Sequence, residues 1–168
     1  MMRVIQLSRE MVAIVDDADF EWLSQWKWSV SKTRNGWRAE RKQRNRELPG
    51  FHYDSVLMHR FIMNAPKGVL VDHWNGNSLD NRRENLRLCT NRQNTQNSRL
   101  HKNNKTGFKG VIWLQRYRKY QANIRIGDKQ DLYLGRFDTP EEAAHAYDEA
   151  ARKHHREFAY LNFPATAQ

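Results

Sequence analysis

The chain has 168 residues and carries 29 Lys and Arg against 19 Asp and Glu, a formal net charge of +10. This length suits one ordinary domain or two small ones, and we expect two. Hydrophobic residues make up 39% of the chain and aromatic residues 11%, which excludes a disordered class. Because the basic excess is spread along the whole chain, a polyanion, most often nucleic acid, is the expected partner. A basic protein with merely solvated charges is the alternative.

No membrane or export segment is expected. The chain lacks the run of about 20 apolar residues that a membrane span requires, and Arg3 and Arg9 interrupt the N-terminus where a signal peptide needs apolar residues. Cys89 is the single cysteine, so neither an internal disulfide nor a multi-thiolate zinc site can form. These features predict a protein of the reducing cytoplasm with no membrane partner.

The first fifty residues predict a strand-rich region with one short helix. Alternating apolar residues indicate strands over 4–7, 12–15, 27–32 and 37–42. Apolar residues at helical spacing from Phe20 to Trp26 indicate a helix, for which Asp16, Asp17 and Asp19 are candidate capping residues. The basic stretch 41–45 is too polar for a core, and a solvated loop and a contact with phosphate explain it equally well.

The central part predicts two strands around a polar loop, followed by a polar helix. An apolar element over 56–63 precedes a short strand that ends in Asp72 and His73. A second strand over 86–90 follows the loop, and 91–100 reads as the helix. Phosphodiester hydrolysis needs a base, for which histidine has a suitable pKa, and a hard cation, for which carboxylate and amide oxygens are suitable ligands.

The segment from about residue 57 to residue 98 resembles the phage and intron-encoded group of HNH endonucleases. The motifs that carry the resemblance are His59-Arg60, Asp72-His73, Asn75-Gly76-Asn77, Asn81-Arg82-Arg83-Glu84-Asn85-Leu86-Arg87 and Gln93-Asn94. The resemblance implies a ββα-metal fold that uses Mg²⁺ or Mn²⁺. One departure is Asn75, where the group usually has Asp, and it lies outside the implied metal site.

The same resemblance assigns roles to four residues. It implies His73 as the general base and Asp72 and Asn94 as the metal ligands. Asn85, grouped with His73 in the catalytic set, would tie the loop together. A strand-end cap is the alternative for an isolated Asp-His pair, but the surrounding motifs favour the nuclease site. For His59 we expect a structural role, with an influence on the site as the alternative.

From Thr106 the pattern changes to three strands, over 108–114, 120–126 and 132–135, and one helix. The helix begins at Thr139-Pro140-Glu141-Glu142, which has the arrangement of a capping box. Residues 106–164 resemble the AP2/ERF DNA-binding domain. The matching motifs are Phe108-Lys109-Gly110-Val111, Ala122-Asn123-Ile124-Arg125, Tyr133-Leu134-Gly135-Arg136-Phe137-Asp138-Thr139, Glu141-Glu142-Ala143-Ala144, Ala146-Tyr147-Asp148 and Leu161-Asn162-Phe163-Pro164.

The AP2 resemblance implies a three-stranded sheet that lies in the major groove of DNA. Lys109, Arg125 and Tyr133 stand where that family places DNA-contacting residues. The turn between the first two strands offers a phosphate clamp, with a solvated turn as the alternative; its basic residues are Arg116, Arg118 and Lys119. Other contact positions differ from plant members, namely Ile112, Leu114 and Asp131, so the plant target sequence is not expected to carry over.

Together these patterns predict an α+β protein. A nuclease domain would span 1–99, a linker 100–105, and a sheet packed on one helix 106–164. We expect a metal-dependent DNA endonuclease of the homing-endonuclease type, which nicks double-stranded DNA as a monomer without a protein partner. The alternative is a sequence-specific DNA-binding regulator whose HNH unit is inactive. RNA binding fits the charge but not the AP2-like sheet.

Overall fold

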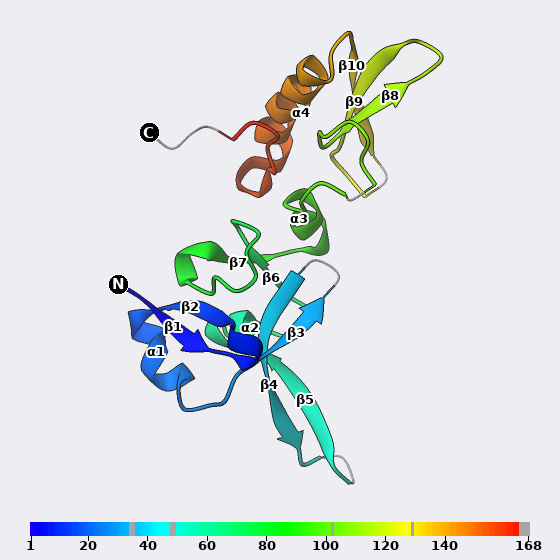
Figure 1. Ribbon diagram of the computed structural model, residues 1–168. Coiled ribbons are helices and arrows are strands. Elements are labelled where there is room, and N and C mark those ends of the chain that lie inside the picture. Colours follow the sequence, from blue (N-terminus) through cyan, green and yellow to red (C-terminus); the bar gives the residue numbers. More distant parts are fainter. Residues whose placement is uncertain (34–35, 48–49, 102, 129, 165–168) are drawn as a thin grey trace. The chain divides into compact units, whose positions relative to one another are not determined.

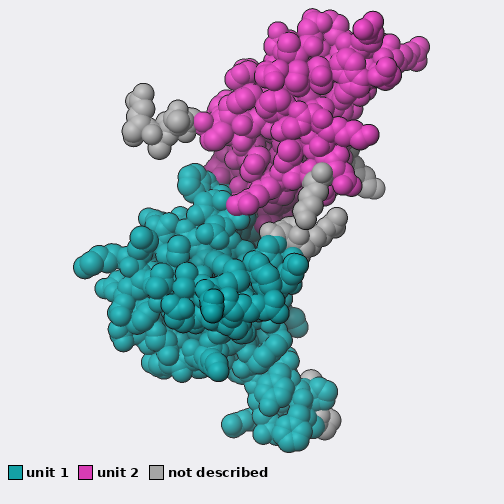
Figure 2. Space-filling view, viewed as in Figure 1, with its two compact units in different colours: residues 1–90 teal, residues 91–168 magenta. Residues whose placement is uncertain are grey.

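A computed structural model describes the chain except for residues 34–35, 48–49, 102, 129 and 165–168. It divides into two compact units, residues 1–90 and residues 91–168 (Figure 2). Both units contain small antiparallel sheets and helices, which confirms the α+β class. Among the described residues, no helix is long and apolar enough to cross a membrane.

The first unit begins with a hairpin. β1 (Met2–Gln6) pairs antiparallel with β2 (Val12–Asp16) around the 3-10 turn η1 (Ser8–Glu10), as the alternation predicts, and α1 (Asp17–Leu23) follows. Asp16 stands at the N-cap position, but its side chain makes no capping hydrogen bond. Its carboxylate instead accepts a 2.7 Å hydrogen bond from the backbone N–H of Arg83. The capping role predicted for Asp16 is therefore wrong, because a tertiary partner takes the oxygen.

A three-stranded sheet follows, with the strand order β3 (Ser29–Thr33), β4 (Gly36–Asn45), β5 (His52–Leu57) (Figure 1). β3 pairs with β4 only as far as Glu40, and from Glu40 to Asn45 the partner of β4 is β5. The stretch 41–45, for which a loop was one expectation, is therefore strand.

The remainder of the first unit carries the polar loop. The apolar stretch 56–63 is divided, because β5 ends at Leu57 and α2 (Met58–Ile62) begins at the next residue. β6 (Leu70–His73) pairs antiparallel with β7 (Leu86–Cys89), and η2 (Arg83–Asn85) precedes β7. The core beneath these elements includes the fully buried side chains of Val15, Leu23 and Met58.

The second unit begins with α3 (Asn91–Gln96) and then forms an antiparallel sheet in the order β10-β9-β8. Its strands are β8 (Val111–Leu114), β9 (Lys119–Arg125) and β10 (Asp131–Phe137), and α4 (Pro140–His155) and η3 (Arg156–Phe158) follow. The predicted capping box is present at the start of α4. The Thr139 hydroxyl accepts from the Glu142 backbone N–H at 3.2 Å, and the Glu142 carboxylate accepts from the Thr139 backbone N–H at 3.3 Å.

Small residues let α4 lie close against the sheet. Ala143, Ala144 and Ala151 are fully buried against a sheet face that includes Ala122. Gly110 marks the closest approach, since a Cβ atom there would lie 2.0 Å from the Tyr147 ring. Its φ of +79° also belongs to the left-handed region that glycine adopts freely. The predicted packing of one helix on three strands is confirmed.

Candidate active site and nucleic-acid interface

Asp72 and His73 occupy the last two positions of β6, where the strand meets the polar loop. Arg87 is the cross-strand partner of Asp72 on β7, and Leu86 is the partner of His73. Only 7% of Asp72 and 8% of His73 is exposed, although both are polar. Buried polar side chains need hydrogen-bond partners, so the contacts of these two residues define their geometry.

The Asp72 carboxylate is held by Arg87. The Arg87 guanidinium donates through Nε at 2.9 Å and through Nη2 at 2.8 Å, and both bonds reach Oδ2 of Asp72. Two bonds from one planar group fix the orientation of the carboxylate as well as its position. Asp72 is therefore an oriented oxygen donor at the strand end.

Asn81 orients the imidazole of His73. Nε2 of His73 lies 3.4 Å from Oδ1 of Asn81, whose own amide group donates to the Leu79 carbonyl at 3.2 Å. An amide oxygen can only accept, so this contact is a hydrogen bond in the tautomer that carries its hydrogen on Nε2, in which Nδ1 is the basic nitrogen. Burial lowers the pKa of His73, while Asn81 and the nearby carboxylates of Asp72 and Asp80 act in the opposite direction.

A second imidazole packs against the first. The rings of His59 and His73 meet edge to face with centroids 5.0 Å apart. Burial, followed by the charges of His73, Arg60 and Arg38, lowers the pKa of His59 to about 3. His59 is thus neutral at physiological pH, and its buried Nδ1 has no hydrogen-bond partner among the residues that the structure describes.

Asn85 ties together the loop between β6 and β7. Its side-chain oxygen accepts from the backbone N–H of Asn75 at 2.9 Å, and its side-chain nitrogen donates to the backbone carbonyl of Asp80 at 2.7 Å. Its own backbone carbonyl accepts from the N–H of Trp74 at 2.9 Å. These three bonds cross the loop, so Asn85 fixes the backbone directly after His73.

β2 and an ion pair support the same loop from outside. The backbone of Ile14 accepts from Asn81 at 2.7 Å and donates to Leu79 at 2.8 Å. The Asp80 carboxylate accepts from Nε of Arg82 at 2.9 Å and from the side chain of Asn75 at 2.9 Å. The Arg82 contact is the main reason that the pKa of Asp80 is lowered.

Three residues of the site were not singled out from the sequence, namely Asp80, Asn81 and Arg87. All three lie in the motif 81–87 or directly before it, so the segment was recognised but the individual contacts were not. The position of Arg87 opposite Asp72 is predictable from the sequence, since antiparallel pairing of the two short predicted strands end to end brings these residues together.

The structure thus brings together Asp72, His73 and Asn85 in the first unit. Asn94 lies on α3, in the second unit, and its role as a metal ligand stays a prediction. In the described part of the chain, no three His, Cys, Asp or Glu side chains form a cluster that could hold a metal ion. A hard cation held by one or two protein oxygens, as is usual for Mg²⁺, fits the Asp72 carboxylate chemically.

In the second unit, one face of the sheet packs on α4 and the other does not. Val111, Ala122 and Ile124 form the packed face. By alternation along β9, the opposite face carries Arg125, whose cross-strand neighbour is Asp131. Arg125 donates to both oxygens of Asp131, at 2.6 and 2.7 Å, and both side chains are exposed. Tyr133 of β10 is also largely exposed, at 55%.

The other predicted DNA-contacting residues of this unit differ in the contacts that their side chains make and in their backbone conformation. Lys119 pairs with Asp138, the Arg116 guanidinium lies 5.6 Å from the Tyr117 ring, and Arg118 adopts a left-handed backbone in the turn. Lys109 differs from them, since its ammonium donates to the carbonyls of Gln96 and Ser98 at 2.6 and 2.7 Å. Burial lowers the pKa of Lys109 to about 8. The roles of all these residues in DNA binding stay predictions.

Comparison with known proteins identifies the two regions. Residues 64–96 match the family model of HNH endonucleases. Protein 3.8 of Escherichia phage T7 is 33% identical over 94 residues, which cover 56% of this chain and 76% of that protein. The chain belongs to the HNH endonuclease family. Its HNH segment begins before β6 and extends through α3, so it contains Asp72, His73, Asn85 and Asn94.

Plant transcription factors match a further region of this HNH family member. The AP2-like ethylene-responsive transcription factor ANT of Arabidopsis thaliana is 45% identical over 60 residues, which are 35% of this chain and 11% of that protein. Dehydration-responsive element-binding protein 2A of the same plant is 44% identical over 66 residues, 37% of this chain and 18% of that protein. The chain spans less than a fifth of these plant proteins, and the matches confirm an AP2-like region.

Proposed function

We propose that this HNH protein is a metal-dependent endonuclease that hydrolyses phosphodiester bonds in double-stranded DNA. The observation that carries the proposal is the pair Asp72 and His73 at the end of β6, both buried and both oriented, by Arg87 and by Asn81. A solitary buried Asp-His pair serves equally well as a strand cap. Its position inside the segment that matches HNH endonucleases favours catalysis.

In this proposal β6, β7 and α3 form the ββα-metal unit. Asp72 and Asn94 would hold Mg²⁺ or Mn²⁺, which would stabilise the charge that develops on the phosphate and on the leaving oxygen. His73 takes the proton of the attacking water at Nδ1, since Asn81 keeps the hydrogen of the neutral ring on Nε2. Asn85 holds the loop that follows His73, and Arg87 keeps the Asp72 carboxylate oriented.

The AP2-like sheet would hold the nuclease on its substrate. Its unpacked face presents Arg125 and Tyr133, which can reach base edges and phosphates in a major groove. The matches to plant transcription factors support DNA as the partner. We place the nuclease domain at residues 1–99 and the AP2-like domain at 106–164, joined by the linker 100–105.

The described part of the chain holds one candidate nuclease centre, which supports nicking by a monomer as the proposed outcome. The relative from phage T7 supports a bacterial cytoplasm as the place of action. The competing function is that of a DNA-binding regulator with an inactive HNH unit. The oriented Asp72 and His73 favour the nuclease, because a regulator needs neither a base nor a metal ligand.

Cleavage of a supercoiled plasmid tests the proposal. We expect wild-type protein to convert it to the open circle in Mg²⁺ or Mn²⁺, and EDTA to stop the reaction. His73→Ala is expected to lower the rate by about 10²- to 10⁴-fold while DNA affinity stays unchanged. DNA binding without any cleavage, over a range of plasmid sequences and both metals, would instead support the regulator. Full activity in EDTA would reject the metal.

A further inference from the structure

The outer part of the sheet in the first unit is a two-stranded ribbon. β3 stops pairing at Glu40, so among the described residues 41–45 of β4 and 52–56 of β5 have only each other as strand partners. Figures 1 and 2 show this hairpin as a projection from the rest of the unit. A lone two-stranded ribbon gains little stability from its own packing. Its side chains are therefore available to contact a binding partner.

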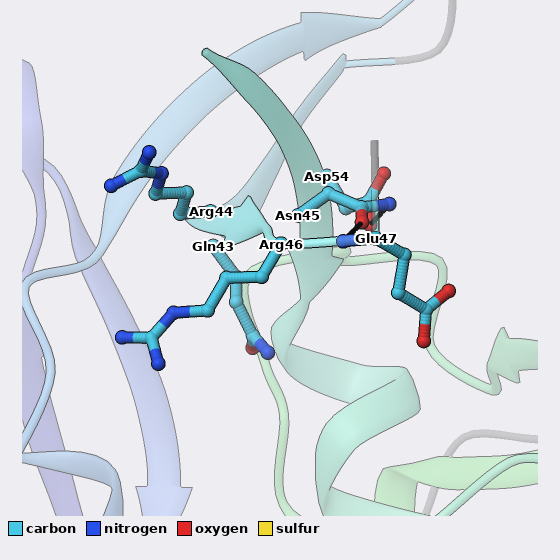
Figure 3. A pocket seen from close by; sticks show the side chains of 6 residues that line it. All are labelled: Gln43, Arg44, Asn45, Arg46, Glu47 and Asp54. Atoms are coloured by element: carbon cyan, nitrogen blue, oxygen red, sulfur yellow. Dashed lines mark hydrogen bonds between the residues drawn. The ribbon is translucent and has the colours of Figure 1, made fainter. Parts of the chain in front are cut away.

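The two faces of the ribbon differ in chemistry. Arg41 belongs to the base of one face and points into the core, with its guanidinium 4.8 Å from the Trp26 ring and 5.2 Å from the Phe61 ring. Lys42 and Arg44 therefore lie on the opposite face, since side chains alternate along a strand. Figure 3 shows Arg46, the residue after β4, extending to the same side as Arg44.

β5 adds aromatic side chains to this basic face. Tyr53 is the cross-strand partner of Arg44, and Phe51, two residues earlier, has its ring 5.0 Å from the Arg44 guanidinium. Phe51 is 81% exposed and Tyr53 is 56% exposed. Neither ring belongs to the buried core of the unit. We call this surface the ribbon face; it comprises Lys42, Arg44, Arg46, Phe51 and Tyr53.

Two acidic residues of the hairpin, Asp54 and Glu47, lie away from the ribbon face. Asp54 alternates to the other side, where its carboxylate accepts a 2.9 Å hydrogen bond from Asn45. Figure 3 shows the side chain of Glu47 pointing away from Arg44 and Arg46. Lys42 contacts the Ser55 hydroxyl and lies 3.6 Å from the buried Glu40 at the base, and its side chain is still 57% exposed. The outer part of the ribbon face is thus uniformly positive.

We propose that the ribbon face binds the DNA duplex, as a second contact surface that belongs to the nuclease unit and not to the AP2-like sheet. The proposal rests on the proposed function for the identity of the substrate. The major groove admits a two-stranded ribbon, Lys and Arg neutralise phosphates, and exposed apolar rings contact bases or sugars. Two separate surfaces on one chain would fix the register of the duplex more firmly than one.

The experiment compares two variants of the full chain that lose the same charge. The ribbon variant is Lys42→Gln/Arg44→Gln/Arg46→Gln, and the control variant is Lys27→Gln/Lys32→Gln/Lys67→Gln, which removes three exposed lysines of the same unit outside the ribbon. Fluorescence anisotropy with a labelled mixed-sequence duplex gives the association constant over a series of salt concentrations. Urea unfolding verifies that both variants retain wild-type stability.

We expect the ribbon variant to make the negative slope of log K against log salt shallower by about two to three. Each lost phosphate contact reduces the magnitude of that slope by about 0.9. The control variant is expected to change the slope by less than one. Phe51→Ser/Tyr53→Ser should weaken binding at every salt concentration and leave the slope unchanged. Equal slopes for ribbon variant, control variant and wild type would overturn the proposal.

The proposed function is tested separately in the same preparations. The control lysines are outside both the candidate active site and the ribbon face, so the control variant should nick plasmid at the wild-type rate. If wild type does not cleave DNA at all, the nuclease proposal fails, and the salt slopes still decide whether the ribbon face binds the duplex.

Discussion

Arg87 and Asp72 face each other across β6 and β7, and both hydrogen bonds from the guanidinium fall on the same carboxylate oxygen. The side chains are only 17% and 9% exposed, so water screens this ion pair weakly. The pair neutralises a buried negative charge and at the same time orients a candidate metal ligand.

Removing Arg87 should therefore destabilise the first unit. We expect Arg87→Met to lower the free energy of unfolding by about 3 to 5 kcal/mol, because the Asp72 charge is left buried without its partner. Glu21→Gln is the control, since it breaks the exposed pair with Arg3 and should cost less than about 1 kcal/mol. Urea unfolding measures both. Equal costs would show that the Asp72 charge is solvated in the Arg87 variant.

Asn81 should act on the reaction through His73. Asn81→Leu keeps the approximate size but removes the oxygen that holds Nε2–H, so we expect about a 10- to 100-fold slower single-turnover cleavage. Asn81→Asp retains an acceptor and should restore part of the rate. If both variants lose activity equally while stability is unchanged, orientation of the imidazole is not the function of Asn81.

Substitutions at Gly110 and Gly107 distinguish the energetic cost of a steric clash from that of an unfavourable backbone conformation. Both have a φ near +80°, but only Gly110 faces the Tyr147 ring, and the space around Gly107 is open. We expect Gly107→Ala to cost about 1 kcal/mol of unfolding free energy for the backbone alone. Gly110→Ala should cost roughly 3 kcal/mol, because overpacking adds to that term. Thermal or urea unfolding of the second unit gives both values.

The sheet of the second unit makes a testable distinction between two arginines. Arg125 lies on its unpacked face, whereas Arg152 lies on the exposed side of α4. We expect Arg125→Ala to weaken DNA binding by about tenfold and Arg152→Ala to have a much smaller effect. Asp131→Asn, which removes the carboxylate that pairs with Arg125, should strengthen binding. A larger loss for Arg152→Ala would mean that the sheet does not face DNA.

The buried His59 predicts loss of stability in acid. Its pKa is about 3 in the folded chain and about 6.5 in the unfolded chain, so between these values only the unfolded chain binds the proton. The free energy of unfolding should therefore fall as the pH is lowered from about 6.5 towards 3. His59→Gln should show a weaker dependence over that range in urea titrations. Parallel pH profiles for variant and wild type would contradict this assignment.

Local patterns predicted the elements that depend on local chemistry. The capping box at Thr139 and the strand that ends in Asp72 and His73 were evident from neighbouring residues alone. Asp16 shows the limit, because a good capping residue was diverted to the backbone of Arg83, which is remote in sequence. A carboxylate pairs with the partner that the fold brings closest, and no local pattern contains that information.

The polar composition of 41–45 likewise obscured the strand that these residues form. Alternation of apolar and polar residues marks a strand only where one face is buried, and beyond Arg41 the described residues of the ribbon have no buried face. The contact of Asn81 with His73 was likewise beyond the sequence, because it depends on the path of the loop between β6 and β7. The resemblance to HNH endonucleases located the candidate site, and the folded structure shows which neighbouring residues orient it.

Lys109 bears on where the chain can be divided. Composition alone would place a cut at residues 100–105, with α3 before that stretch and Lys109 after it. The Lys109 ammonium nevertheless binds the carbonyl of Gln96 at the end of α3 and that of Ser98 just after the helix. Arg92 of α3 adds a hydrogen bond to the carbonyl of Ile126, which strengthens the same attachment. An expression fragment that ends at the linker would keep the whole HNH segment in sequence but leave its last helix without the anchors that hold it in the intact chain.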